Sequence, residues 1–557
     1  MNNLIIDTET TGLNHQTDKA FAVSFAWADK EDITFLDLTK KHSLGIIKNI
    51  LINSQLLIGH NLKFDLHQLI QAGIPWEIMK DKKFYCTQIA EACLNEHKKS
   101  YSLDNLGKEY FDMPKIDIAM QVREYFNIKR LAKDKAMQLL PEMPIEWVAK
   151  YCNKDVEITR KLYLKQKDKM KDEPIFALEM KVLPNLLEVE RRGLNFQLNK
   201  LEDARKEFEA ELEQLQAKVV INTSSPIEMK EQFIKLGLDI PISEATGKPT
   251  FAKPALKNID HPFVQDVLKL RGLRKLVEGY LRTLGNYVIK DKLYTNFHQA
   301  KSDEYGTISG RLSSSQPNMQ QQGKKNKRAY KAIRSLFVAP PGYTWICFDW
   351  AAFEFRVLSH YSQDINLENA YNENPDLDFH QVVADMAGID RRMAKTINFG
   401  LAFGMGELRL GRELGLNQDE TKELFETYHK KFPTIKNFLK VASSVGAKRK
   451  YVKTILGRKI RFPNNELCYK AGALIFQGSA SDIMKNKIVE FNEDNYLKKL
   501  GCELILVVHD EFNFIVATEN KDKSMTQINK IMEDVPELNI PVRASGGFGN
   551  SWYEAGL

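Results

Sequence analysis

The most informative stretch of this sequence runs from residue 391 to residue 404 and reads Arg-Arg-Met-Ala-Lys-Thr-Ile-Asn-Phe-Gly-Leu-Ala-Phe-Gly. Two cations and two aromatic residues recur in it at every fourth position, namely Arg391, Lys395, Phe399 and Phe403. We therefore expect them to form one stripe along a helix. Such cations can hold phosphate groups while a ring stacks on a base. The stretch alone also fits a core helix with a solvated basic end, so its surroundings must decide.

Two acidic residues flank this stretch at the ends of apolar runs. Asp349 follows residues 343–348, which we predict to be a strand. Asp510 lies between residues 504–508 and 512–516, which are predicted to form a hairpin. Either aspartate alone would be unremarkable at a strand end. Together, on adjacent strand ends, they have the arrangement that a two-metal phosphoryl transfer needs.

Four more acidic residues lie in the amino-terminal third of the chain. Asp7 and Glu9 follow an apolar run and share one face of a predicted strand. Asp65 follows another apolar run, and Asp155 lies four residues beyond Tyr151 on one helix face. A single acidic pair is typical of a solvated strand edge. Four carboxylates and a tyrosine instead predict a cage for two Mg²⁺ ions that clamp a phosphodiester, with the tyrosine orienting the attacking water.

The chain is too long for one core, because 557 residues correspond to about three to five domains. Residues 1 to about 170 alternate short apolar runs at 4–6, 20–27, 33–36 and 56–58 with helical stretches, which predicts an α/β domain. A lysine-rich stretch at 161–172 ends at Pro174, where we place a helix end and a domain boundary. Residues 175 to about 280 predict long helices, including a heptad-like stretch at 201–219 before a polar loop at 222–226. A basic run lies at 324–334, and helices dominate again from 364 to about 439.

Composition excludes several classes of protein. With 43% hydrophobic and 27% charged residues the chain is of the ordinary globular kind. The net charge of +7 is small, so a nucleic acid would have to be bound by local basic patches. The six cysteines form no Cys-x-x-Cys pair, which favours reduced thiols over a structural zinc site. Neither a membrane-spanning apolar run of about 18 residues nor a signal peptide is visible.

The amino-terminal motifs resemble the Asp-Glu-Asp-Asp exonuclease family whose third motif contains a tyrosine, the proofreading type. This resemblance implies that the metal ligands are Asp7, Glu9, Asp65 and Asp155. It further implies that Tyr151 orients the attacking water and that Leu13 and Asn61 lie near the terminal nucleotide.

The rest of the chain resembles the family A DNA polymerases, the bacterial DNA polymerase I type. Residues 349–356, 391–404 and 509–511 match motifs A, B and C, with further matches at 307–314, 317–320, 378–380, 477–482 and Trp552. The resemblance implies an α/β multidomain fold, in which an RNase H-like exonuclease domain at 1–172 precedes a right-hand polymerase domain at 173–557. Its thumb would be mostly 173–295, its palm 296–363 and 467–557, and its fingers 364–466.

The same resemblance implies a role for each polymerase residue. Asp349 and Asp510 would bind catalytic metals, with Glu511 accessory. The incoming triphosphate and base would be held by Arg391, Lys395, His380, Phe399 and Phe403, and Glu354 would exclude ribonucleotides. DNA contacts would come from Arg311, Asn318, Gln320, Gln477 and His509. Arg311 and Gln477 would touch the minor groove, where acceptors recur whatever the sequence. Each active site would use two Mg²⁺ ions, with Mn²⁺ as a substitute.

The sequence departs from the usual family pattern at several positions. Motif A usually reads Asp-Tyr-Ser-Gln-Ile-Glu, whereas residues 349–354 read Asp-Trp-Ala-Ala-Phe-Glu. Motif B has Phe403 where a tyrosine is usual. Tyr469 and Ala473 stand where relatives usually carry an arginine and an asparagine that face the DNA, and we expect both on one helix face with Gln477.

These observations predict a DNA-templated DNA polymerase with 3′-5′ proofreading activity in replication or repair. Its expected partners are primer-template DNA, deoxynucleoside triphosphates and a single-stranded 3′ end. We expect a monomer in the cytoplasm of a bacterial or phage-infected cell, with an organelle as the alternative. Neither a flap-nuclease domain nor a thioredoxin-recruiting insertion is expected. A single-subunit RNA polymerase is disfavoured by Glu354 and the exonuclease motifs, and a non-catalytic DNA-binding scaffold by the intact acids.

Overall fold

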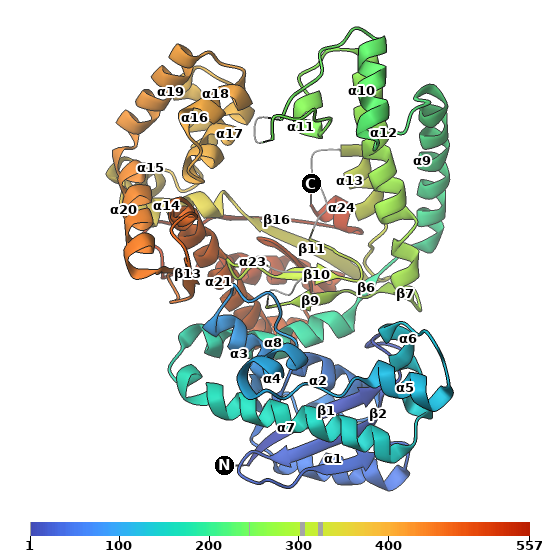
Figure 1. Cartoon of the computed structure of the whole chain (residues 1–557). Coiled ribbons are helices and arrows are strands. Elements are labelled where there is room, and N and C mark those ends of the chain that lie inside the picture. The colour runs from blue at the N-terminus through green and yellow to red at the C-terminus, as the bar shows by residue number, and fades with distance from the viewer. Residues whose placement is uncertain (1, 244–245, 301–306, 321–326, 557) are drawn as a thin grey trace. The chain divides into compact units, whose positions relative to one another are not determined.

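The computed structural model describes residues 2–243, 246–300, 307–320 and 327–556. The chain divides into two compact units (Figure 1). The first unit comprises Met1–Arg192, Asn296–Gln320 and Ile346–Gly546. The second comprises Gly193–Thr295, Gln321–Trp345 and Gly547–Leu557. Both clusters of acidic residues that the sequence singles out belong to the first unit.

A mixed five-stranded sheet forms the amino-terminal part of the first unit. Its strands are β1 (Asn3–Thr10), β2 (Ala20–Trp27), β3 (Thr34–Asp37), β4 (Leu56–Gly59) and β5 (Lys83–Cys86), in the order β3-β2-β1-β4-β5. The β1–β2 and β2–β3 pairs are antiparallel, whereas β1–β4 and β4–β5 are parallel. The first four strands confirm the sequence prediction. The fifth was missed because it has only four residues, the first of them a lysine.

Helices bury both faces of this sheet. They are α1 (Lys41–Asn53), α2 (Leu62–Gln71), α3 (Thr87–Leu94), α4 (Leu103–Phe111), α5 (Ile118–Phe126), α6 (Lys133–Gln138) and α7 (Ile145–Met170). The core between them is apolar, and Ile5, Leu57 and Leu66 are fully buried in it. Leu66 is on α2 and the others are on β1 and β4, so packing holds the helix that carries Asp65 against the strand that carries Asp7.

Helix α8 (Pro174–Arg192) begins where the sequence predicts a boundary. The preceding helix ends at Met170, and Pro174 is the first residue of the next one, a position that suits proline because its missing N–H has no partner there. The helix packs against β5 and against α21 (Ala471–Glu493) of the carboxyl-terminal region, so it belongs to the first unit.

A second, four-stranded sheet has the order β14-β15-β11-β16. The strands are β14 (Glu503–Val508), β15 (Glu511–Ala517), β11 (Tyr343–Trp350) and β16 (Ala544–Gly549). The antiparallel β14–β15 pair confirms the predicted hairpin. The sequence did not predict β16, which is rich in glycine. A Cβ on Gly546 would lie 2.3 Å from the ring of Phe348, so glycine permits the close approach of the two strands.

The chain between and after these strands is mostly helical. After β11 come α14 (Phe353–Ser362), α15 (Ile365–Glu373), α16 (Phe379–Ala387), α17 (Arg391–Ala402), α18 (Glu407–Leu414), α19 (Gln418–Lys431) and α20 (Pro433–Arg449). After α21 come α22 (Asn495–Leu500) and α23 (Lys521–Glu533). One prediction was wrong: Tyr469 lies in a 3₁₀ turn at Cys468–Lys470, outside the α-helix that begins at Ala471 and carries Gln477.

The second unit is mostly helical, as predicted. It contains α9 (Leu198–Lys218), α10 (Pro226–Lys235), α11 (Lys253–Leu256), α12 (Pro262–Leu276), α13 (Lys327–Arg334), α24 (Trp552–Ala555) and a small sheet in the order β6-β8-β7. Those strands are Leu194–Asn195, Lys292–Leu293 and Val288–Ile289. Trp552 is fully buried in this unit, where the Arg334 guanidinium lies 3.9 Å from its ring centroid. Of the basic run expected at 324–334, residues 324–326 lie outside the described residues. Among the helices that the structure describes, none is long and apolar enough to span a bilayer.

Two candidate acidic active sites

Asp7 and Glu9 lie on the same face of β1, as their spacing predicts. Ligand atoms of Asp7, Glu9 and Cys152 all lie within 4.8 Å of one another. The thiol Sγ donates a hydrogen bond to the Asp7 carbonyl oxygen at 3.4 Å and lies 3.6 Å from Asp7 Oδ2. Burial, together with Glu9 and Asp7, raises the pKa of the Cys152 thiol well above its usual range. Cys152 is therefore a neutral donor to Asp7, which leaves the carboxylate oxygens as the candidate metal ligands here.

Asp65 reaches the same strand from α2. The backbone N–H and the hydroxyl of Thr8 donate to Asp65 Oδ1 at 3.0 and 2.8 Å. Asn61 precedes this helix in the left-handed conformation with φ 60°, which asparagine tolerates better than most residues. Burial raises the pKa of Asp65 to about 7, and the two hydrogen bonds from Thr8 oppose that rise.

Tyr151 and Asp155 lie one turn apart on α7, again as predicted. Asp155 forms an ion pair with Lys115, whose Nζ lies 5.0 Å from the centroid of the Tyr151 ring. Burial alone would lower the pKa of Lys115, but Asp155, Tyr151 and Asp7 outweigh it and raise that pKa well above its usual range. Sequence reasoning missed Lys115, because an isolated lysine between two helices carries no signal of its function.

The buried acids of this site repel one another. Burial raises the pKa of Asp7 well above its usual range, and the charges of Asp155, Asp65 and Glu9 raise it further. Burial and Asp155 raise the pKa of Glu9 in the same way. A cluster of oxygen donors whose ionisation is suppressed by mutual repulsion suits a hard divalent cation, which would compensate the charge. The structure thus brings together four predicted ligands and Tyr151.

The two residues expected near the terminal nucleotide are exposed. Leu13 follows β1 and is 63% exposed, although leucine side chains are usually buried. Asn61 is also exposed, directly before α2. Both segments adjoin elements that carry metal-ligand candidates, which agrees with contact to a substrate.

The second acidic cluster lies in the β14-β15-β11-β16 sheet. Asp349 is the next-to-last residue of β11, and Asp510 is in the turn before β15, the neighbouring strand. The rings of Trp350 and Phe512 are in edge-on contact at 5.5 Å, which brings the two aspartates to the same end of the sheet. Glu511 is buried and accepts a hydrogen bond from Asn513 Nδ2 at 3.0 Å.

Gln320 holds the turn that carries Asp510. Its Oε1 accepts from the His509 backbone N–H at 2.9 Å, and its Nε2 donates to the Val507 carbonyl at 2.8 Å. Asn318 Oδ1 in turn accepts from the Gln320 backbone N–H at 2.9 Å. In this structure two of the predicted DNA contacts, Asn318 and Gln320, therefore also support the hairpin turn.

Glu354 and Arg311 form an ion pair beside Asp349. Burial raises the pKa of Glu354, and the Arg311 guanidinium opposes that rise. Glu354 lies in the first turn of α14, which follows Ala352 in the left-handed conformation with φ 50°. Trp350, one of the departures from the usual motif, stacks on Phe353 at 4.1 Å and donates from Nε1 to the Met532 carbonyl at 2.8 Å. Of the changed motif residues, Trp350 and Phe353 therefore pack in the core, whereas Ala351 is exposed.

The stripe predicted on residues 391–403 exists on α17. Arg391 pairs with Asp378 at 2.5 Å, while Lys395 is exposed and lies 5.8 Å from the Phe399 ring centroid. The rings of Phe399 and Phe403 stack at 6.1 Å. Phe403 is the residue that caps the helix rather than part of it. Cations therefore lie at the start of the stripe and rings at its end.

His380 is buried beside this stripe. Asn398 Nδ2 donates to His380 Nδ1 at 2.9 Å, which leaves Nε2 as the protonated nitrogen. Burial, with a contribution from Lys395, lowers the pKa of His380 to about 4, so the imidazole is neutral at neutral pH. Sequence reasoning missed Asn398 as its partner, although the residue lies within the quoted stretch.

The residues near Gln477 differ from expectation. Gln477 is half-buried on α21, whereas Ala473 on the preceding turn is 4% exposed. Tyr469 is 53% exposed, and its backbone oxygen would lie 3.4 Å from a Cβ on Gly404. Tyr469 lies outside the helix, so the expectation that it shares a helix face with Gln477 was wrong, whereas Ala473 lies one turn before Gln477 on α21, as expected.

Comparison with known proteins agrees with both clusters. The family model described as DNA polymerase family A matches residues 191–554, and the model described as 3′-5′ exonuclease matches residues 1–171. The chain is 30% identical to a DNA polymerase DpoZ of Acinetobacter phage SH-Ab 15497 over 97% of this chain and 95% of that protein. It is 27% identical to DNA polymerase I of Pseudomonas aeruginosa over 99% of this chain and 63% of that protein.

A solved structure has the same fold. It is described as the POL domain of Pol1 from M. smegmatis in complex with DNA primer-template and dNTP, and it superposes with a TM-score of 0.81 at 23% identity. The superposition covers 100% of this chain and 96% of that one. The chain therefore belongs to the family A DNA polymerases and is a DNA-directed DNA polymerase with an amino-terminal 3′-5′ exonuclease domain.

Proposed function

We propose that Asp349 and Asp510 are the metal ligands at which this enzyme extends a primer 3′ end on a DNA template with deoxynucleoside triphosphates. The observation that carries the proposal is the location of both aspartates at one end of two neighbouring strands. Two Mg²⁺ ions, or Mn²⁺ as a substitute, would lower the pKa of the primer hydroxyl and stabilise the leaving pyrophosphate when bound. Glu511 would support this pair from its buried position.

The neighbouring side chains would bind the incoming nucleotide and the DNA. Arg391 and Lys395 would hold the triphosphate, with His380 as a neutral donor through Nε2. Phe399 and Phe403 would line the pocket for the base. Arg311 and Gln477 would contact the minor groove at the primer terminus, and Asn318, Gln320 and His509 would contact DNA nearby.

We propose a separate proofreading site at the amino-terminal sheet. Asp7, Glu9, Asp65 and Asp155 would hold two divalent ions there, and Tyr151 would orient the attacking water. Burial raises the pKa of Tyr151, so its phenol stays protonated and can donate a hydrogen bond. Leu13 and Asn61 would contact the terminal nucleotide of a single-stranded 3′ end.

We further propose that the enzyme acts as a monomer in a bacterial or phage-infected cell. The relatives named above come from a bacterial virus and a bacterium, which supports this setting.

Variants that separate the two activities test these assignments. Asp349→Asn or Asp510→Asn should lower primer extension by at least about a thousandfold while leaving degradation of single-stranded DNA, because only one acidic site is altered. Asp7→Ala combined with Glu9→Ala should do the reverse. Both activities are measured with labelled primers in Mg²⁺, and Asp522→Asn, which alters an 89% exposed carboxylate, is the matched control.

Loss of both activities from either variant, with circular dichroism showing a folded chain, would contradict two independent sites. Full extension by Asp349→Asn would contradict the polymerase assignment alone.

A further inference from the structure

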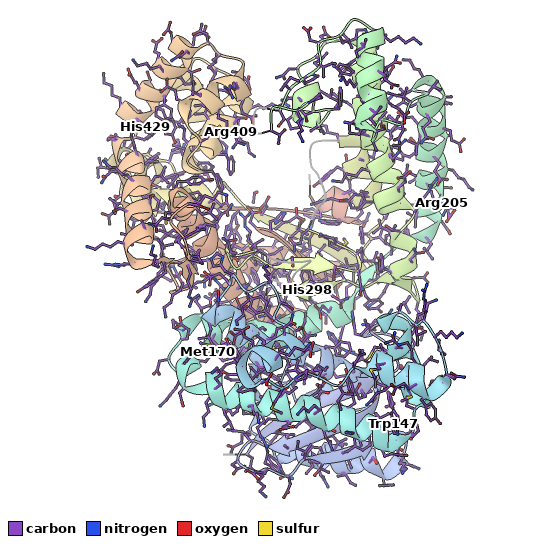
Figure 2. The ribbon with its side chains drawn as sticks, in the orientation of Figure 1. Trp147, Met170, Arg205, His298, Arg409 and His429 are labelled. Carbon is purple, nitrogen blue, oxygen red and sulfur yellow. The ribbon has the colours of Figure 1, made fainter. Side chains whose placement is uncertain are left out.

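A broad groove lies in the first unit, away from both acidic clusters. It has a volume of about 1080 Å³ and runs between the start of β5, the end of α7, α8 and α22. Its floor is apolar and includes Leu56, Phe84, Met170, Ala177, Met180 and Pro184. Met170, at the end of α7, is labelled in Figure 2. An open, partly apolar hollow of this size on a folded unit is typical of a binding surface.

The groove is separate from the proofreading site on topological grounds. Strands β1, β4 and β5 are parallel, and Leu56, which lines the groove, pairs with Asn3 at the start of β1. Asp7 and Glu9 lie in the second half of β1. The groove is therefore at the amino ends of these strands and the carboxylates are toward their carboxyl ends, and Asp349 and Asp510 are not among its lining residues.

The rim of the groove is positively charged. Six exposed lysines line it, namely Lys80, Lys83, Lys167, Lys171, Lys181 and Lys498. Three exposed acids accompany them, Asp81, Asp168 and Glu493. A fourth acid, Glu188, is already paired with Arg192. The excess of cations favours an anionic occupant.

Two buried polar atoms in the groove lack a hydrogen-bond partner among the residues that the structure describes. They are the hydroxyl of Tyr85 and the Nδ2 of Asn492, and both residues line the groove. Tyr85 is 6% exposed, so its hydroxyl cannot readily reach bulk water. Because the protein itself covers both atoms, an occupant of the groove would contact the exposed side chains around them and not these two atoms.

The aromatic rings of the groove do not offer stacking faces. Tyr85 is packed between Tyr163 at 4.9 Å and Phe176 at 4.7 Å. Tyr163 and Phe176 are themselves more than nine-tenths buried. Base stacking on exposed rings is what sequence-independent binding of single strands usually requires. These rings instead form an apolar floor, which suits aliphatic or aromatic side chains from a partner.

We propose that this groove is a docking site for an acidic peptide segment of a partner protein. Carboxylates of the segment would pair with the rim lysines, and an apolar side chain would lie on the floor beside Met180 and Ala177. Such a site would tether the polymerase to another protein while leaving both acidic clusters free.

Fluorescence anisotropy with a synthetic peptide tests this proposal. The probe is a short fluorescein-labelled peptide of aspartates with two leucines, compared with the same peptide carrying serines for leucines, or lysines for aspartates. An oligothymidylate of equal length tests for nucleic acid. We expect the acidic leucine peptide to bind the full chain, the serine peptide to bind several-fold more weakly, and the lysine peptide not to bind.

Variants of the groove give the decisive comparison. Lys167→Glu, Lys171→Glu and Lys181→Glu together should weaken peptide binding by about tenfold or more, since each solvent-exposed ion pair contributes little and reversal also adds repulsion. Ala177→Trp should weaken it by filling the floor without changing charge. The matched control reverses Lys48, Lys169 and Lys523, which are exposed and do not line the groove.

Extension and exonuclease rates of every variant should equal those of the unaltered chain, which shows that each is folded. Equal peptide affinity in the groove and control variants would overturn the proposal. So would equal binding of the serine peptide, which would indicate charge attraction alone, or oligothymidylate binding that only the groove variants lose, which would indicate a nucleic-acid track.

Discussion

Glu354 is the residue on which contacts from two parts of the polymerase site converge. It pairs with Arg311, the residue proposed to sense the primer terminus. The ring of Phe403, which stands where a tyrosine is usual, packs on Phe399 and, at 5.6 Å, on Phe476. Movement of Arg311 to DNA would therefore leave the buried carboxylate of Glu354 with less compensation. Primer contact and the position of Glu354 are coupled through this ion pair.

Sugar discrimination should depend on the size of residue 354 rather than on its charge. Glu354→Ala should raise ribonucleotide incorporation relative to deoxynucleotide by about tenfold or more, because the space at the 2′ position opens. Glu354→Gln loses the ion pair but keeps the bulk, so it should retain most of the discrimination. Phe399→Tyr should ease dideoxynucleotide entry by supplying a hydroxyl. Each effect is measured as the steady-state ratio of ribonucleotide or dideoxynucleotide to deoxynucleotide incorporation. An unchanged ribonucleotide ratio in Glu354→Ala would contradict the role of Glu354 in sugar discrimination.

The exonuclease should show a pH dependence that shifts with metal concentration. Asp65 has a pKa raised to about 7, and the pKa values of Asp7 and Glu9 are also raised, so protons compete with metal for these oxygens. At limiting Mg²⁺ the rate should therefore rise with pH through about 7, and at saturating Mg²⁺ the midpoint should move lower. Rates of single-stranded DNA degradation across a pH and Mg²⁺ grid measure this. A midpoint independent of Mg²⁺ would contradict the competition.

The same pKa directions have a consequence for folding. A carboxyl whose folded pKa lies above its unfolded value binds more protons in the folded chain between those two values. Without metal, stability should therefore fall as pH rises from about 4, the ordinary value, to about 7 for Asp65. Bound metal removes that cost.

At the scale of elements, the residue at which α21 begins determines that Tyr469 lies next to Gly404, the last residue of motif B. Residues 468–470 form a 3₁₀ turn, so the side chain of Tyr469 is displaced from the helix stripe that a continuous α-helix would give. The turn lies next to Gly404, and Lys470 Nζ lies 5.5 Å from the Tyr469 ring centroid. An exposed aromatic therefore stands at a position where relatives usually carry an arginine, with a lysine nearby.

Tyr469→Arg should tighten primer-template binding and steepen its salt dependence. One added phosphate contact should change the slope of log binding constant against log salt concentration by about 0.9. The primer-extension rate at saturating DNA should barely change. Tyr496→Arg, at an exposed tyrosine on α22, is a matched control for added charge. Anisotropy titrations at several salt concentrations measure both. An unchanged slope and affinity would mean that position 469 does not face DNA or that Lys470 already supplies the contact.

At the scale of the whole molecule, a buried ion cluster joins the amino-terminal region to the polymerase core inside the first unit. Arg458 donates to Glu179 of α8 at 2.6 Å and to Asp482 of α21 at 2.7 Å. Lys485 donates to Glu179 at 2.5 Å. Burial alone would raise the pKa of Glu179, but Lys485 and Arg458 outweigh it and the pKa is lowered. Buried ion pairs thus hold α8, the segment around Arg458 and α21 together.

Breaking this cluster should destabilise the first unit, although none of its residues belongs to either acidic cluster. Asp482→Asn leaves Arg458 under-compensated in a buried position, so we expect a loss of about 3–5 kcal/mol in the free energy of unfolding. Glu493→Gln, at an exposed acid on the same helix, should change it by less than about 0.5 kcal/mol. Urea unfolding measures both. A small effect of Asp482→Asn would mean that the cluster contributes little to holding the segments together.

Loss of the cluster should also reach the polymerase site. Gly310 has φ +78°, and a Cβ there would lie 2.5 Å from the Arg458 guanidinium carbon. The backbone next to Arg311 therefore packs against Arg458, so Arg458 would position Arg311 for the primer contact proposed above.

Features with a local physical cause were predictable from the sequence alone. Alternation along a strand places Asp7 and Glu9 on one face, and four-residue spacing places Tyr151 beside Asp155. The hairpin around Asp510 follows from two apolar runs separated by a polar turn. Ordered motifs over almost the whole length then pointed to the family, which the comparisons confirm.

Features that depend on residues distant in sequence were decided only by the tertiary structure. Lys115 meets Asp155, and Asn398 fixes the tautomer of His380, because packing brings separate elements together. The glycine-rich β16 has little strand propensity of its own, and β5 is only four residues long, so pairing with neighbouring strands decides where both form. The lysine-rimmed groove is likewise a product of the tertiary structure, because its lysines come from four segments that are separate in the sequence. The sequence pattern of each segment does not indicate that the four lie together. Local spacing determines which face of an element a side chain occupies, whereas only the burial of those faces against one another determines what it meets.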